Sequence, residues 1–179
     1  MNSVSPPSRI ETNRLILRPL KAEDKLPIAA LRSNSLVNQY LDRPKATTVE
    51  EAVKFIDKIQ RATADGQSFY WAITLVNDDT LIGAVCFWSI SEDHLTIEVG
   101  FELHPDFQGK GLMQEALTVV IEYAFNRLGF STITAFTHPE NSSSIRLLEK
   151  CGFKQDISAA IIPDAHSTEN LVGFYRVKV

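Results

Sequence analysis

The sequence is poor in the residues that mark disulfide-rich, redox-active or metal-binding proteins. Of its 179 residues only two are cysteines, Cys86 and Cys151, and they lie far apart with no CxxC or Cys/His spacing. We therefore expect two small buried side chains in a reducing compartment, without a disulfide or a nucleophilic thiol. The four histidines are scattered without metal-ligand spacing, so no metal is expected.

Long apolar runs and an excess of basic charge are also missing. The longest apolar run, residues 81–90, is far too short to span a bilayer. Residues 1–8 lack the basic start and apolar stretch of a signal peptide. The formal net charge is −4 and no basic stripe stands out, which argues against a nucleic-acid partner. These features predict a cytoplasmic protein with no membrane or nucleic-acid partner.

What is present is the pattern of a single α/β domain. No linker or internal repeat divides the chain, so we expect one domain over residues 1–179, with residues 1–9 as a flexible lead-in. Three consecutive strands before a helix favour a mixed, mostly antiparallel sheet with helices on both faces. Periodicity predicts strands at 14–18, 70–76, 81–90, 94–103, 133–136, 154–162 and 171–178, and helices at 22–32, 49–64, 111–128 and from Asn141 to about Cys151.

The second of these helices has a clear start signal. Thr48 precedes two acidic residues, which is typical of an N-cap followed by the positive end of a helix. Val53, Ile56 and Ile59 are predicted to face inward. The helix is expected to end near Ala64, before a glycine.

A glycine-rich loop follows the predicted strand 94–103 and opens the helix 111–128. Gly109 and Gly111 flank Lys110, and such a loop collects unpaired backbone N–H groups at the positive end of a helix, which favours phosphate. The loop is not a P-loop, because no glycine lies five residues before Gly109 and no Ser or Thr follows the lysine. It is not a dinucleotide loop either, because Gln114 replaces the third glycine.

The loop matches a different pattern, Q/R-x-x-G-x-G/A, and so resembles the coenzyme-A pyrophosphate loop of the GNAT acetyltransferase superfamily. The wider sequence, over about residues 10–178, resembles the RimJ/RimL branch of that superfamily. Two positions depart from the pattern: Met113 stands where a small residue is usual, and Leu148 where many members have a tyrosine acid. The matching pieces are TxRLxLR near the start, Ile82-Gly83, Glu98-Val99-Gly100-Phe101, QGKGLMxEAL, and Asn141-x-x-Ser144 followed by Gly152-Phe153.

The resemblance implies a GNAT-type sheet of about seven strands, splayed between its fourth and fifth strands where the thioester of acetyl-CoA enters. It implies that the strand edge pairs with the pantetheine amides and that backbone N–H groups of the loop hold the pyrophosphate. It also implies that the residue capping the last helix touches the pantetheine arm. The cofactor-binding residues implied are Phe101, Glu102 and Leu103 on the strand, Gln108, Gly109, Lys110, Gly111, Leu112 and Met113 in the loop, and Asn141 at the cap.

Acetyl transfer to an amine requires loss of a proton from the amine and departure of the thiolate. Glu98 is the candidate general base, directly or through water, because it alternates away from the apolar face of its strand near the expected splay; a surface or salt-bridged carboxylate is the alternative. Gly100, two residues on, suggests a bulge or a close approach by the ligand. Ser144 is the candidate hydrogen-bond donor to the leaving thiolate, because RimL-like sequences have a serine there; the alternative is a plain capping role.

The acceptor amine is left open by the sequence. An N-terminal α-amine of a protein would need an open groove. A polyamine would need an acidic pocket, to which Glu50-Glu51 or Glu92-Asp93 could contribute. Small amines, amino acids and antibiotics are further acceptors, and a non-catalytic acyl-CoA sensor is the competing class. Acceptor choice is expected around Glu98, Trp88 and residues 36–69, and a homodimer through the C-terminal hairpin is an open expectation.

Overall fold

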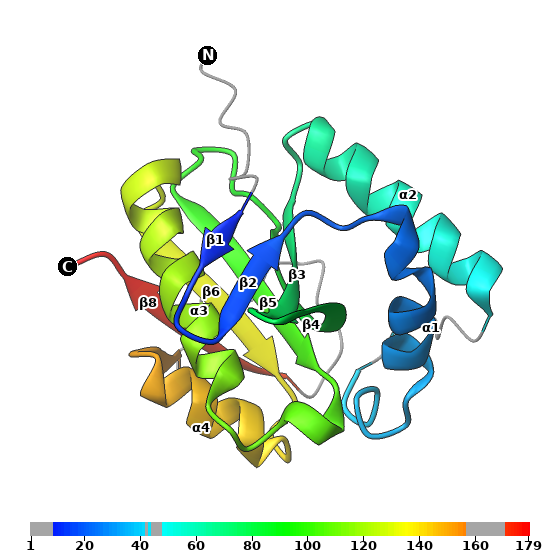
Figure 1. Cartoon of the computed structure of the whole chain (residues 1–179). Helices are drawn as coiled ribbons and strands as arrows, with labels where there is room; N and C mark the ends of the chain where they lie inside the picture. The colour runs from blue at the N-terminus through cyan, green and yellow to red at the C-terminus, as the bar shows by residue number, and fades with distance from the viewer. Residues whose placement is uncertain (1–8, 42, 44–47, 157–170) are drawn as a thin grey trace.

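The computed structural model describes residues 9–41, 43, 48–156 and 171–179. Its elements follow the predicted order, with one extra short strand at the start (Figure 1). Short 3-10 turns lie at Ala22–Asp24 and Pro105–Phe107, and a π-helical turn at Ala124–Leu128. The strands are β1 (Ile10–Glu11), β2 (Leu15–Arg18), β3 (Phe69–Leu75), β4 (Asp78–Trp88), β5 (Thr96–Leu103), β6 (Thr132–Thr137), β7 (Lys154–Asp156) and β8 (Val172–Val177), and the helices are α1 (Lys25–Ser33), α2 (Val49–Ala64), α3 (Leu112–Tyr123) and α4 (Ser142–Lys150).

One mixed sheet carries all of these strands, in the order β1-β2-β3-β4-β5-β6-β8-β7. All neighbours are antiparallel except β5 and β6, which are parallel. The β5–β6 ladder runs only from Thr96↔Thr132 to Glu98↔Thr134, although both strands continue past it. The predicted splay is therefore confirmed: the fourth and fifth predicted strands, which are β5 and β6, diverge beyond Glu98.

Helices cover both faces of the sheet, as predicted. Figure 1 shows α3 and α4 on one side and α1 with α2 on the other. The larger core packs α3 and α4 against side chains such as Trp71 and Phe87, whereas the smaller core packs α1 and α2 against Tyr70, Ala72 and Ala84. Neighbouring residues of β3 thus enter opposite cores, as the two-residue period of a strand requires.

The second helix is where predicted, but its inner face is rotated. Thr48 caps α2, with its side chain accepting the Glu51 N–H in a capping box. Ala52 and Ile56 are buried and Ile59 is partly buried against the same cluster. The prediction for Val53 was wrong, since it is 39% exposed. One residue beyond Ala52 is about 100° further round the helix, so it falls off the buried stripe.

Several predicted boundaries shift in the structure. The β3–β4 turn is the two-residue pair Val76-Asn77, so β4 begins at Asp78 instead of Leu81. The predicted helix 111–128 is α-helical only to Tyr123 and then widens into the π-helical turn before Gly129. Of the predicted strand 154–162, residues 157–162 lie outside the described residues; β7 covers the rest and pairs with β8.

Candidate active site

The loop between β5 and α3 has the backbone geometry of an anion site. Gly109 and Gly111 have φ values of 72° and 73°, in the left-handed region that favours glycine. Gly111 is the N-cap of α3, so the first N–H groups of that helix have no acceptor within it and point from its positive end. Gln108 donates from Nε2 to the Leu103 carbonyl at 2.8 Å, which fixes the loop beside the end of β5. A phosphate placed there would meet several backbone donors.

A distant segment braces this loop. Arg14, just before β2, donates to the Lys110 carbonyl at 2.9 Å and to the Glu115 carboxylate at 2.7 Å. The Thr12 hydroxyl donates to the same carboxylate at 2.5 Å. Burial raises the pKa of Glu115, but the bonds from Thr12 and Arg14 outweigh it and hold that pKa below its usual value. Sequence reasoning missed this brace, because Arg14 and Glu115 are 101 positions apart.

Beyond Glu98 the strand β5 has one open edge. It stays paired with β4 as far as Gly83↔Leu103, whereas its pairing with β6 stops at Glu98↔Thr134. Backbone groups from Val99 onward on the β6 side therefore face the gap between the strands, and an extended ligand could add there as a strand would. The edge leads directly into the glycine loop. Three predicted pantetheine contacts lie on it: Phe101, Glu102 and Leu103.

Glu98 lies at the last paired position before the gap. Its neighbours across the sheet are Trp88 on β4 and Thr134 on β6. Although it alternates away from the apolar residues of its strand, as predicted, it is only 3% exposed. A solvent-facing position is thus ruled out, while its role as general base stays a prediction.

Gly100 has a close neighbour, but the neighbour belongs to the protein. A Cβ at this position would lie 2.1 Å from the Trp88 ring. The β4–β5 register runs unbroken through it, so the predicted bulge is absent from these two strands. Only glycine leaves room for the indole, which therefore covers β5 next to Glu98.

The start of α4 carries two further predicted residues. Asn141 is the N-cap, and its side-chain oxygen accepts the Ser144 N–H at 3.1 Å, which confirms its capping role. Ser144 is half-buried in the first turn. Leu148 is fully buried in the larger core, so the position of the usual tyrosine contributes no acid. The contacts of Asn141 and Ser144 with a cofactor stay predictions.

The two acidic pairs considered for a polyamine pocket lie elsewhere. Glu50 and Glu51 are exposed in the first turn of α2, where Glu51 completes the capping box. Glu92 and Asp93 are exposed in the β4–β5 turn, where Asp93 accepts hydrogen bonds from its own turn. Glu51 and Asp93 therefore stabilise local structure.

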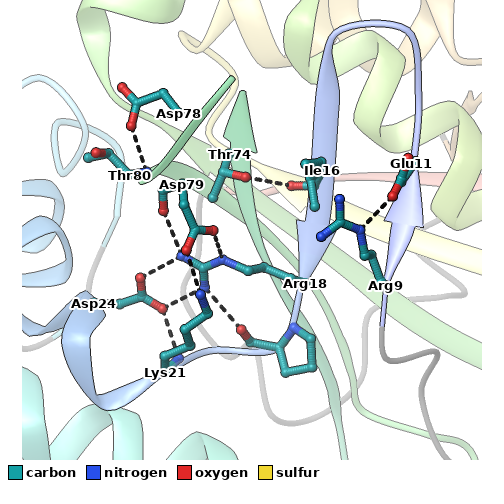
Figure 2. A network of polar contacts seen from close by, with 11 residues as sticks. Arg9, Glu11, Ile16, Arg18, Lys21, Asp24, Thr74, Asp78, Asp79 and Thr80 are labelled. Atoms are coloured by element: carbon teal, nitrogen blue, oxygen red, sulfur yellow. Dashed lines mark hydrogen bonds and ion pairs between the residues drawn. The ribbon is translucent and has the colours of Figure 1, made fainter. Parts of the chain in front are cut away.

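A separate charge network lies on the β2 side of the sheet, with Arg18 and Asp24 buried and Lys21 and Asp79 exposed (Figure 2). Arg18 bonds both oxygens of Asp24 at 2.8 Å and Asp79 at 2.6 Å, and Lys21 bonds Asp79 at 2.5 Å. Burial lowers the pKa of Arg18, but its bonds to Asp24 and Asp79 outweigh that and raise it. The network joins β2, the turn before α1 and the β3–β4 hairpin. Because its charges satisfy one another, we assign it to the scaffold.

The described residues give little support to a metal site, a membrane-spanning helix or a cysteine nucleophile. No group of three or more His, Cys, Asp or Glu residues in them is placed to hold a metal ion, and no helix there is long and apolar enough to cross a membrane. The two cysteines are unpaired; Cys151 is buried and Cys86 half-buried. Burial raises the pKa of both thiols, which disfavours the nucleophilic thiolate.

A splayed sheet with a glycine loop beside the open strand agrees with what comparison finds. The family model for the acetyltransferase (GNAT) domain matches residues 14–154. The chain belongs to the GNAT acetyltransferase family. The uncharacterised N-acetyltransferase YoaA of Bacillus subtilis is 31% identical over 147 residues, covering 82% of this chain and 83% of YoaA. As a GNAT member, the protein is an acetyl-CoA-dependent N-acetyltransferase.

Solved structures give the same GNAT fold. A GNAT-family acetyltransferase from Bacillus anthracis has a TM-score of 0.75 at 25% identity, covering 93% of this chain and 95% of the other. The ribosomal-protein-S5-alanine acetyltransferase from Vibrio fischeri has a TM-score of 0.77 at 21% identity, covering 94% and 96%.

More distant GNAT relatives differ in the acceptor that their names state. The Escherichia coli ribosomal protein uS5-alanine N-acetyltransferase is 25% identical over 159 residues, which cover 84% of this chain and 80% of that enzyme. The spermidine N(1)-acetyltransferase of the same organism is 27% identical over 138 residues, covering 76% and 71%. Similarity alone therefore leaves the acceptor of this enzyme undecided.

Proposed function

We propose that this enzyme acetylates the N-terminal α-amine of a protein or peptide. The proposal rests on the carboxylate side chains of β5 that lie on the face of the sheet covered by α1 and α2. Of the two carboxylates there, Glu102 is paired with Arg43 at 2.5 Å and its side chain is only 9% exposed. Glu98, which is only 3% exposed, lies at the last paired position before the sheet opens. An α-amine of pKa about 8 needs one mild base, whereas a polyamine brings further positive charges that need partners.

The donor half of the site follows from the loop and the open edge. The backbone N–H groups of residues 109–113 would hold the pyrophosphate, with Gln108 keeping the loop against β5. The pantetheine amides would pair along residues 101–103, with Asn141 on the other side of the gap. This places the thioester toward Glu98, where β5 and β6 begin to part.

The chemistry needs two proton-related events. Glu98 takes a proton from the ammonium, directly or through water, so that the amine nitrogen can bond to the thioester carbonyl carbon. Collapse of the tetrahedral intermediate breaks the C–S bond, and the second proton of the nitrogen passes to the departing thiolate, directly or through water, which gives the amide and CoA thiol. Ser144 would donate a hydrogen bond to that sulfur. Because a thiol of pKa about 8.5 is already a fair leaving group, we assign Ser144 the smaller contribution.

A CoA-release assay over a panel of amines tests the proposal. The panel contains peptides with free N-termini, the same peptides with blocked N-termini, spermidine, free amino acids and an aminoglycoside. We expect turnover with the free N-terminal peptides and its loss when the N-terminus is blocked. Spermidine as the best acceptor would contradict the proposal and favour the polyamine alternative. Tight acetyl-CoA binding without thiol release from any amine would favour a sensor.

A further inference from the structure

The opening between β5 and β6 is bordered by β5 on one side and by β6 and the residues after it on the other. We call these two sides the β5 bank and the β6 bank, and the strand register shows which residues lie opposite one another. The last paired residues are Glu98 and Thr134. Glu102 on β5 and His138, directly after β6, each lie four residues beyond that pair. They therefore stand on opposite sides of the gap, at the end that leads toward the glycine loop.

A single chain segment contacts both banks. It consists of residues 34–41 with Arg43, between α1 and α2, and we call it the bridging segment. On the β5 bank, Arg43 donates to the Glu102 carboxylate at 2.5 Å. On the β6 bank, the Tyr40 ring stacks on His138, with ring centroids 5.4 Å apart and planes inclined by 22°. The segment thus passes over the gap on its α1–α2 side.

The bridging segment is held in one conformation from within. Asn38 is 6% exposed and forms three bonds: it donates to the Arg32 and Asn34 carbonyls, each at 2.8 Å, and accepts from Arg43 Nε at 2.9 Å. A buried amide with its bonds satisfied specifies a unique local geometry. The anchor for the β5 bank is therefore fixed before any ligand arrives.

The second anchor is oriented as well. His138 Nδ1 accepts the backbone N–H of Glu140 at 3.2 Å, which holds the ring. The Tyr40 ring lies on an imidazole whose direction is already set. Side chains from two separate loops thus meet on the α1–α2 side of the gap.

We propose that the bridging segment is a fixed wall over the acyl-transfer cleft, and that the Tyr40–His138 stack is the contact that keeps bulk water from the thioester and aligns the acceptor amine. The inference rests on the proposed acetyl transfer. Tyr40 and His138 are positioning residues, since no step passes a proton or bond through them.

The wall matters because two nucleophiles compete for the thioester carbonyl. Attack by the amine nitrogen breaks the C–S bond and gives the acetylated amine and CoA thiol. Attack by water breaks the same bond and gives acetate and CoA thiol. Excluding water favours the first reaction and fixes the approach of the amine. Loss of an aromatic stack removes about 0.5–1.5 kcal/mol, which corresponds to a change of about threefold to tenfold.

The test compares Tyr40→Ala with the wild-type enzyme in three measurements. These are the release of thiol from acetyl-CoA without acceptor, the KM for the best amine, and the equilibrium Kd for acetyl-CoA. We expect acceptor-free hydrolysis and the acceptor KM each to rise about threefold to tenfold. The Kd should stay unchanged, because the loop and the strand edge hold the donor. Tyr40→Phe, which keeps the ring, should restore both values.

Leu26→Ala is the matched control on the neighbouring helix α1, outside the bridging segment, since this side chain is 62% exposed. His138→Ala should reproduce Tyr40→Ala, and the double variant should add little. Thermal melting of each variant shows that it is folded. The proposal is overturned if Tyr40→Ala hydrolyses acetyl-CoA and binds the amine as Leu26→Ala does, or if Tyr40→Phe is as damaged as Tyr40→Ala. The hydrolysis measurement needs no acceptor, so a wrong choice of amine class leaves its result readable.

Discussion

Glu98 lies almost fully out of water at the point where the sheet opens, and this position defines the task of its carboxylate. It is on the α1–α2 face, next to the Trp88 ring that Gly100 admits. A carboxylate in a closed cleft can take a proton from an ammonium that has left bulk water with it. In the proposed mechanism Glu98 acts early in the reaction, before the C–N bond forms.

The Glu98→Gln variant should lose about a hundredfold in turnover at neutral pH, with the largest loss at low pH. Below its pKa of about 8 an α-amine is mostly protonated and depends on a base, whereas at high pH the free amine reacts unaided. The measurement is kcat/KM over pH with a peptide acceptor. Glu122→Gln, an exposed carboxylate on α3, is the control. Equal rates for Glu98→Gln and wild type at all pH values would remove Glu98 from the mechanism.

At the scale of elements, the proposed donor site is a junction of β5, the glycine loop and α3. Gln108 ties the loop to the strand, and Arg14 ties it to the start of β2 while bonding Glu115 in the first turn of α3. These bonds hold the backbone donors before the ligand binds. Preorganisation of this kind lowers the free-energy cost of binding a phosphate.

Two glycines with positive φ lie at opposite ends of one helical segment. Alanine variants at these positions distinguish an effect on acetyl-CoA binding from an effect on the stability of the fold. Gly111, with φ 73°, starts α3, and Gly129, with φ 84°, ends the turn that follows it. Alanine at either position should cost about 1–2 kcal/mol of stability in chemical denaturation. Only Gly111→Ala should also weaken acetyl-CoA, by about tenfold in calorimetry, because relaxing the strain turns the loop N–H groups away. Equal affinities for the two variants would place the phosphate elsewhere.

At the scale of the whole molecule, the order of elements was predictable from periodicity, whereas the splay was implied only by the resemblance to the GNAT superfamily. Local chemistry was predictable too, such as the Thr48 and Asn141 caps. The two-residue strand β1 has too little sequence to show a period. Val53 was misplaced because apolar identity alone does not define a helix face.

Contacts between segments far apart in the chain were not predictable from one sequence. Nothing in the spacing of Tyr40 and His138 indicates that their rings stack. The same holds for the pairing of Arg43 with Glu102, which changes the charge of the cleft. The proposed donor loop could be predicted from the sequence because a local motif forms it, whereas its contacts with acetyl-CoA stay a prediction. The acceptor side depends on tertiary packing.

The most direct test of the whole account is to locate the acetyl group on a peptide that offers two amines. A peptide with a free N-terminus and one internal lysine is incubated with acetyl-CoA and the enzyme, and fragment-ion mass spectrometry assigns the product. The account predicts acetylation of the α-amine with the lysine unmodified, because the α-amine loses its proton to a single mild base far more readily. Acetylation of the lysine instead, or of spermidine but of no peptide, would contradict it.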